Sequence, residues 1–136
     1  MANIVRFDAA LIGAIAGFLW GELDGILLAL ISFIALDYLT GVLVAIMEKQ
    51  LSSSVGFAGI ARKGLILAVV AVGHIVDVHV LGGDGAIFRS AVICFYLANE
   101  GMSILENAGK LGMPLPRKLK EVLKQLEAES ENEEEQ

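Results

Sequence analysis

The sequence predicts an all-α integral membrane protein with three or four transmembrane helices and a C-terminal cytoplasmic amphipathic helix. Hydrophobic residues make up 56% of the 136 residues, against roughly 45–50% in soluble domains, and the mean hydropathy is +0.70. The formal net charge of −6 comes from the glutamates of residues 127–135. The rest of the chain is electrically balanced, which argues against a nucleic-acid partner.

Four apolar segments account for the predicted transmembrane helices. The second segment carries only one charge, Asp37, and is long enough to cross a bilayer, for which about 20 residues suffice. The first segment loses its apolar character after Gly21, so whether it crosses decides between three and four spans. The predicted spans are about 9–25, 26–47, 64–81 and 86–105.

The last two predicted spans form a hairpin, because the glycine-rich stretch 82–85 between them is a tight turn. We assign residues 1–111 to the membrane domain and residues 112–136 to a charged cytoplasmic tail.

Basic residues fall on one side of the predicted spans. With four spans, that side holds the N-terminus, the loop 48–63 and everything after Leu105, and the loops of the opposite side hold no Lys or Arg. The basic residues of the first side are Arg6, Lys49, Arg62, Lys63, Lys110, Arg117, Lys118, Lys120 and Lys124. Because Lys and Arg favour the cytoplasmic face, we expect the C-terminus in the cytoplasm, whether or not the first segment crosses.

The tail contains the predicted amphipathic helix. Pro114 and Pro116 end the preceding helix, and apolar residues then recur at the i, i+3, i+4, i+7 spacing of one helix face. These residues are Leu119, Val122, Leu123 and Leu126. The basic residues that we expect to face lipid headgroups are Arg117, Lys118, Lys120 and Lys124, and each contributes about 1 kcal/mol on an anionic leaflet.

Small residues recur every four positions through the first segment. Residues four apart share a helix face, and small residues there let two helices approach closely in lipid. The ridge consists of Ala9, Gly13, Gly17, Gly21 and Gly25. We interpret it as a helix-packing and oligomerisation surface, and its partner is a helix either of the same chain or of another copy.

Asp37 lies in the middle of the second span. Inserting an aspartate there costs roughly 2.5–3.5 kcal/mol on translocon scales. Such a residue marks an ion path, a polar contact between helices or a water-filled cavity. The alternative is a protonated Asp37 that bonds to a neighbouring helix. Thr40 and Gly41 share its helix face.

The third span holds His74, Asp77 and His79. On a helix His79 points about 140° away from His74, so we predict no metal site. A polar pair near the outer end of this span, in contact with Arg89 across the hairpin, fits the sequence better than a metal site. We find no catalytic residues, cofactor motif or nucleophile–base–acid set, and expect no enzyme and no cofactor.

A polar stripe runs along the last span. Arg89, Tyr96, Ser103 and Lys110 recur every seven residues, and Asn99, Glu100, Glu106 and Asn107 fall beside them. A polar face within a bilayer must be buried in protein or turned to water, so polar residues within the spans are candidates for the lining of a pore. These candidates are Asp37, His74, Asp77, Arg89, Tyr96, Asn99, Glu100 and Ser103. Alternatively, the helix leaves the membrane near Glu100 and gives its acids to cytoplasmic water.

Three stretches resemble the phage holin family that includes the clostridial toxin-secretion holins. They are DYLTGVL (37–43), LSSSVGFAGIARKGLIL (51–67) and FYLANEGMSILENAGKLGMPLPRKLKEVL (95–123). The resemblance implies a multi-pass protein of the bacterial cytoplasmic membrane that oligomerises and opens lesions in the lipid bilayer. A phage endolysin or a secreted toxin would leave through these lesions without direct contact, and lysis of the host cell would follow.

Two other functions fit the composition. A small proton-coupled transporter built of four short helices would use an acid such as Asp37 for coupling. A membrane adaptor protein would recruit a partner through its charged tail.

Overall fold

A computed structural model describes residues 1–83 and 85–134 of the chain; the side chains of residues 123, 126, 127, 130, 131, 133 and 134 are not described. The described residues form helices joined by short connections, with no β-strand among them. The α-helices are α1 (Ala2–Trp20), α2 (Gly25–Met47), α3 (Ser53–Ile75), α4 (Ile87–Lys110) and α5 (Arg117–Glu134), and a π-helical turn, Val76–Val80, continues α3.

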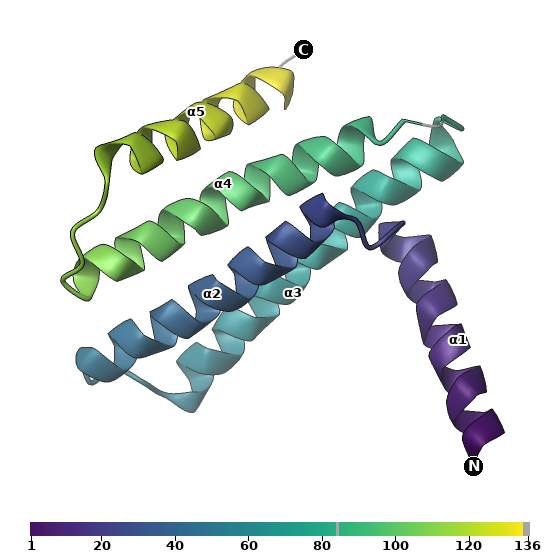
Figure 1. The fold of residues 1–136 in the computed structure, drawn as a ribbon, viewed down its shortest axis with the longest axis horizontal. Coiled ribbons are helices and arrows are strands. Elements are labelled where there is room, and N and C mark those ends of the chain that lie inside the picture. Colours follow the sequence, from purple (N-terminus) through teal and green to yellow (C-terminus); the bar gives the residue numbers. More distant parts are fainter. Residues whose placement is uncertain (84, 135–136) are drawn as a thin grey trace.

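Helices α2, α3 and α4 lie side by side and form a bundle, in which α4 packs against both of the others (Figure 1). Helix α1 contacts α3 and then points away from the bundle, and α5 turns back along α4 (Figure 1). The connections α2–α3 and α4–α5 therefore share one end of the bundle. The connections α1–α2 and α3–α4 lie toward the other end.

The apolar core fills the half of the bundle near the α1–α2 turn. Its buried side chains come from all three bundle helices, and Trp20 at the end of α1 packs against them. The indole Nε1–H of Trp20 also donates to the Leu67 carbonyl oxygen at 2.8 Å. The buried core residues are Leu27, Leu30, Ile66, Val70 and Ile93.

Glycines permit two close approaches within the fold. Gly21 ends α1 with φ of 75°, and a Cβ there would lie 2.7 Å from Cε1 of His74. A Cβ on Gly73 would lie 3.2 Å from the backbone of Phe88 and Arg89, so this glycine brings α3 against the start of α4. Such contacts between small residues and backbone are typical of helix packing in membranes.

Helix α3 begins well before the apolar segment that starts at Gly64. The extended Ser52 is its N-cap, since its Oγ accepts a hydrogen bond from the Val55 N–H at 3.3 Å. Arg62 and Lys63 therefore belong to α3 and not to a loop 48–63. Lys63 thereby reaches the interior of the bundle.

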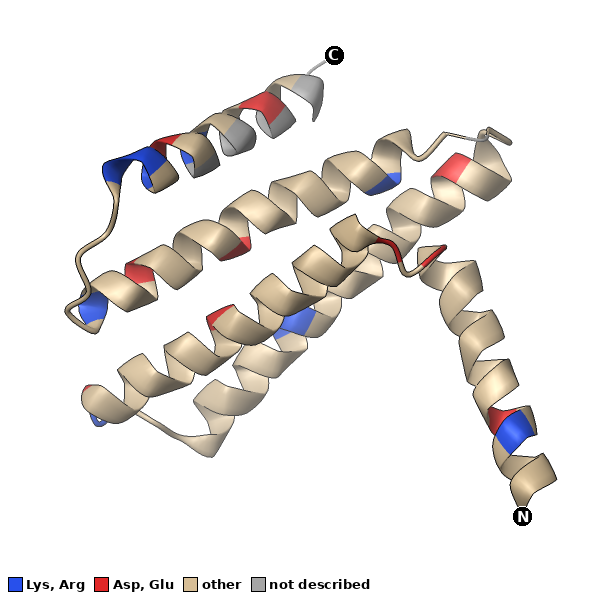
Figure 2. Cartoon of the chain, viewed as in Figure 1, with Lys and Arg blue, Asp and Glu red and all other residues tan. Residues whose placement is uncertain are grey.

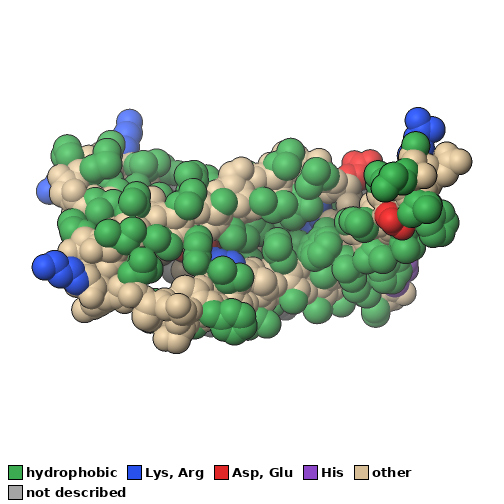
Figure 3. Space-filling model, turned by 90° about the horizontal axis from the view of Figure 1, so that it is seen from below, with side chains coloured by type: hydrophobic (Ala, Val, Ile, Leu, Met, Phe, Trp, Pro, Cys, Tyr) green, Lys and Arg blue, Asp and Glu red, His purple; other side chains and the backbone are tan. Residues whose placement is uncertain are grey.

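In the described part of the chain, three helical segments are long and apolar enough to cross a membrane: Ala2–Trp20, Gly25–Met47 and Ser53–Val80. Helix α4 has 24 residues but is not among them, because its charged and amide side chains lower its hydropathy. The α3–α4 connection is short, as the hairpin prediction requires. The bundle carries few charges along its length (Figure 2), and hydrophobic side chains cover most of the face seen in Figure 3.

Candidate functional site

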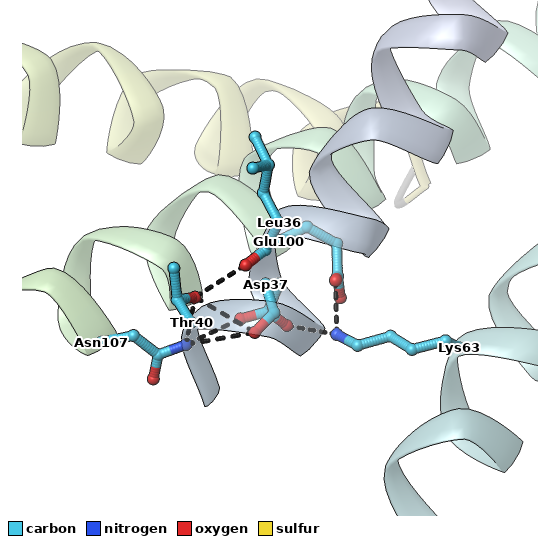
Figure 4. A network of polar contacts seen from close by, with 6 residues as sticks. All are labelled: Leu36, Asp37, Thr40, Lys63, Glu100 and Asn107. Atoms are coloured by element: carbon cyan, nitrogen blue, oxygen red, sulfur yellow. Dashed lines mark hydrogen bonds and ion pairs between the residues drawn. The ribbon is translucent and has the colours of Figure 1, made fainter. Parts of the chain in front are cut away.

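Three charged side chains from three helices meet inside the bundle. Lys63 of α3 donates through Nζ both to Oδ2 of Asp37 on α2 and to Oε2 of Glu100 on α4 (Figure 4). Asp37 and Glu100 are each only 6% exposed. We call these three residues the central cluster.

Two neutral side chains extend the central cluster. Asn107 donates through Nδ2 to Oδ1 of Asp37 at 3.1 Å and to Oγ1 of Thr40 at 2.9 Å. Thr40 in turn donates to the Leu36 carbonyl oxygen at 2.8 Å (Figure 4). Both oxygens of Asp37 thus accept hydrogen bonds, and its buried charge is well compensated.

The central cluster lies near the middle of each helix. Asp37 and Glu100 are far from both ends of α2 and α4, and Lys63 is deep within Ser53–Val80. The side chain of Glu100 therefore faces the protein interior and contacts Lys63. This arrangement corresponds to the polar interhelical contact among the alternatives for Asp37.

A cleft of about 250 Å³ leads to the central cluster from the α2–α3 connection. Leu51 and Val55 line it near that connection, and Asp37, Lys63 and Asn107 line it at the cluster. Ser103, Tyr38 and the glycines 56 and 59 also line it; a Cβ on Gly59 would lie 3.4 Å from the Tyr38 ring. The predicted residue Ser103 therefore belongs to the same site.

A second polar cluster joins α4 to the α1–α2 turn. Arg89 is 4% exposed and donates through Nε to the Trp20 carbonyl at 2.8 Å and through Nη2 to the Glu22 carbonyl at 3.0 Å. Its Nη1 donates to Oδ2 of Asp24 at 2.8 Å. The hydrogen bond from the Arg89 guanidinium lowers the pKa of the Asp24 carboxyl below its ordinary value.

Asp77 and the two histidines have structural contacts at this end. Asp77 accepts the backbone N–H groups of Phe88 at 3.0 Å and Arg89 at 2.8 Å, so it caps the start of α4. The predicted polar contact with Arg89 across the hairpin is therefore made by Asp77 to the Arg89 backbone, while the Arg89 guanidinium binds Asp24. His74 rests against Gly21, and the His79 ring lies 4.9 Å from the Phe18 ring.

Tyr96 and Asn99 of the predicted stripe have no part in the central cluster. Tyr96 packs against the apolar core and meets Phe95 edge-on at 5.1 Å, and Asn99 is exposed.

Lys63 was not among the predicted site residues, because its position after a serine- and glycine-rich stretch suggested a loop. The serines at 52–54 do indicate a helix start, but a short interfacial helix was expected there, and the structure continues the helix through Lys63.

The ridge of small residues has little contact within the chain. The predicted ridge is interrupted, because Gly21 ends α1 and Gly25 begins α2. Among the described residues, nothing lies within 4 Å of a Cβ built on Gly13, Gly17 or Gly25, and Gly21 meets His74 closely. Gly13, Gly17 and Gly21 line an apolar cleft of about 400 Å³ with Leu27 and Leu67.

The basic residues predicted to face headgroups are exposed on α5. They are Arg117, Lys118, Lys120 and Lys124.

Comparison with known proteins identifies relatives over most of the chain. A family model described as the bacteriophage holin family matches residues 14–128. An uncharacterized 14.9 kDa protein from the nagH 3′ region of Clostridium perfringens is 43% identical over 91% of this chain and 93% of its own length. An uncharacterized Listeria monocytogenes protein is 44% identical over 99% of this chain and 95% of its own. A "probable holin" of Bacillus phage phi105 is 33% identical over 84% of this chain and 82% of its own. No solved structure matches the chain.

Proposed function

The chain belongs to the bacteriophage holin family, and we propose on this basis that it is a holin of the bacterial cytoplasmic membrane. The match to the family over residues 14–128 is the observation that carries the proposal. In this role copies of the chain assemble in the membrane and open lesions. A phage endolysin or a secreted toxin then leaves through the lesions without a docking surface of its own, and the host cell lyses.

The charge distribution supports a cytoplasmic C-terminus. Lys49 and Lys110 lie at the bundle end that also leads into α5 with its basic residues (Figure 2). At the other end Glu22 and Asp24 occupy the turn, and the nearby Arg89 is bound to Asp24. Because basic residues are retained in the cytoplasm, we assign the α2–α3 connection and α5 to that side.

Helix α1 is the element best suited to bind other copies. None of its residues, all of which are described, is buried, and its large apolar side chains, such as Phe7, Leu11 and Ile15, are more than half exposed. The free glycines 13 and 17 offer a surface that a second helix could approach closely. We therefore assign homo-oligomerisation to this helix.

The proton-coupled transporter has less support than the holin. Its coupling acid would be Asp37, and Lys63 and Asn107 already occupy both oxygens of that carboxylate. No observation specifically favours an adaptor role.

Induced expression in a bacterium tests the holin function. We expect normal growth while the protein accumulates, followed by an abrupt loss of membrane potential, and lysis only when an endolysin is produced in the same cells. Cells that express the endolysin alone are the control. Continued growth and a maintained potential, with the protein abundant in the membrane fraction, would contradict the proposal.

A further inference from the structure

We propose that the central cluster is a proton-binding site that exchanges with the cytoplasm, and that loss of its proton loosens the packing of α2, α3 and α4. The inference rests on the proposed function for the side of the membrane that the cleft faces. The site binds a single proton, on a carboxylate shared between two helices.

The charge balance of the central cluster requires the proton. Among the described residues, the titratable groups that face the site are Asp37 and Tyr38 from α2, Lys63 from α3 and Glu100 from α4. One ammonium and two carboxylates leave a net charge of −1, and an uncompensated buried charge is costly. A carboxylic acid in place of one carboxylate makes the cluster neutral.

The contacts indicate Glu100 as the proton carrier. Asp37 accepts Lys63 on Oδ2 and Asn107 on Oδ1, and such donors favour the ionised form. The donor that the described residues offer to Glu100 is Lys63, which Asp37 shares. Asp37 is therefore the better carboxylate, and Glu100 holds the proton in the packed bundle.

The surroundings of the site allow exchange at one end only. The cleft from the α2–α3 connection has about 250 Å³, room for several water molecules of about 30 Å³ each. Toward the opposite end the buried side chains of Leu30, Val70 and Ile93 close the bundle. A proton that leaves Glu100 therefore passes to water in the cleft and so to the cytoplasm.

Proton loss favours separation of the helices. The reaction converts the Glu100 carboxylic acid to a carboxylate and releases one proton to water, which restores the net charge of −1 in the interior. Hydration of this charge then favours a loosened bundle, in which the polar faces of α2 and α4 turn to water. Rising cytoplasmic pH should therefore promote opening, by at most tenfold in the opening equilibrium per pH unit for one proton.

Infrared spectroscopy of the full-length protein in lipid vesicles detects the proton directly. Between about pH 5 and pH 9, where ordinary carboxyls are ionised, we expect a carbonyl-stretch band of a protonated carboxylic acid that disappears as the pH rises. Glu100→Gln and Asp37→Asn should each remove the band, because each leaves one carboxylate paired with Lys63. The control Glu106→Gln changes an exposed acid of the same helix and should keep it.

A missing band in the wild-type protein at about pH 5–6, or a band that persists in both Glu100→Gln and Asp37→Asn, would overturn the proposal. Both substitutions preserve side-chain shape, and circular dichroism establishes that the variants are folded.

Dye release from the same vesicles separates this inference from the holin function. We expect release by the wild-type protein to increase with pH and release by Glu100→Gln to be independent of pH. Release by the wild type that does not vary with pH would contradict the link between proton loss and opening. Absence of release from every variant at every pH would contradict the holin function, and the infrared titration would still decide whether the site binds a proton.

Discussion

At the residue scale, Lys63 connects more of the bundle than any other side chain in the described part of the chain, since it bonds to acidic side chains on both α2 and α4. Its ammonium compensates two acids that are each 6% exposed. Removal of one partner from a buried ion pair typically costs about 3–5 kcal/mol, because the remaining charge is left without a counter-charge. The stability of the bundle should therefore depend strongly on this lysine.

We predict that Lys63→Met lowers the free energy of unfolding by about 3–5 kcal/mol, measured by denaturant titration in detergent micelles. The neighbouring Arg62 is exposed on the same helix, so Arg62→Met is the matched control and should change stability by less than about 1 kcal/mol. A triple variant that adds Asp37→Asn and Glu100→Gln to Lys63→Met should recover much of the loss. Equal stability of Lys63→Met and the wild type would contradict a structural role of the cluster.

Asp24 gives the opposite end of the molecule its own pH dependence. Because the Arg89 guanidinium lowers the pKa of Asp24 from its ordinary value of 3.8, the folded protein favours the carboxylate. The resulting stabilisation is fully present above about pH 4 and is lost as the pH falls through the lowered pKa. We expect acid to loosen the α1–α2 turn, reported by the fluorescence of Trp20, whose carbonyl oxygen Arg89 binds.

Two variants test this acid response. Asp24→Asn should show the loosened fluorescence signal already at neutral pH and lose the acid transition. Asp8→Asn, which changes an exposed acid of α1, should retain it. An unchanged acid transition in Asp24→Asn would show that another group is responsible.

The sequence identified both acids of the central cluster but not the cation between them. Asp37 and Glu100 were recognisable because an acid within an apolar helix needs a partner. Lys63 precedes its apolar segment in the sequence, and only the length of α3 brings it inside. Arg89 was recognisable as a buried charge. Its partners were not, because they lie at the α1–α2 turn, far away in the sequence, where no helical periodicity indicates them.

At the element scale, α1 and α4 use their faces in opposite ways. Helix α4 buries Glu100 within the bundle and Arg89 against the α1–α2 turn. Helix α1 buries none of its residues and leaves its glycines 13 and 17 without close contacts among the described residues. Helix α4 thus packs within the bundle, and α1 is the helix to which we assign the proposed homo-oligomerisation.

We predict that Gly17→Leu reduces the fraction of chemically crosslinked oligomers several-fold, because a leucine prevents close approach of helix backbones on the ridge. Ile15→Leu, which changes the opposite face of α1 and keeps the side-chain volume, should leave the oligomers unchanged. Because a Cβ on Gly17 meets nothing within 4 Å among the described residues, the substitution should not disturb the fold of the single chain. Undiminished oligomers in Gly17→Leu would exclude the ridge as the contact surface.

Hydropathy and turn signals predicted most of the helices but not all of their ends. The apolar segment 26–47 lies on α2, the segment 86–105 lies on α4 apart from its first residue, and the glycine-rich stretch 82–85 does separate α3 from α4. The start of α3 depends on the cap at Ser52 and not on hydropathy. The apolar segment therefore predicted only the second half of α3. The direction of α1 was not predictable, since it depends on Gly21 against His74 and on Arg89 binding the end of the helix.

At the scale of the whole molecule, the central cluster and the Arg89 cluster hold the bundle at two levels. The first faces the end that we assign to the cytoplasm, and the second joins α4 to the turn at the other end. The apolar core separates the two clusters. Changes at one level can therefore loosen one end of the bundle while the other remains packed.

The proposed number of membrane crossings depends on whether α1 and α4 both cross. Helix α1 has 19 residues, about 28 Å at the standard rise, which is close to the thickness of the hydrocarbon core. Helix α4 packs along α2 and α3 and buries its charges against them, so it should cross with them. We propose four crossings, which would place both ends of the chain in the cytoplasm and the α3–α4 turn outside.

Labelling of single introduced cysteines with a membrane-impermeant maleimide tests this topology. We expect Gly85→Cys to react in intact spheroplasts, and Asn3→Cys and Gln125→Cys to react only after the membrane is permeabilised. The chain without an added cysteine, which retains Cys94, gives the background. Reaction of Asn3→Cys from outside, with Gln125→Cys still protected, would mean three crossings, with α1 lying on the outer surface. The ridge of α1 could then bind another copy only at that surface, so this result would also move the proposed oligomer contact out of the bilayer.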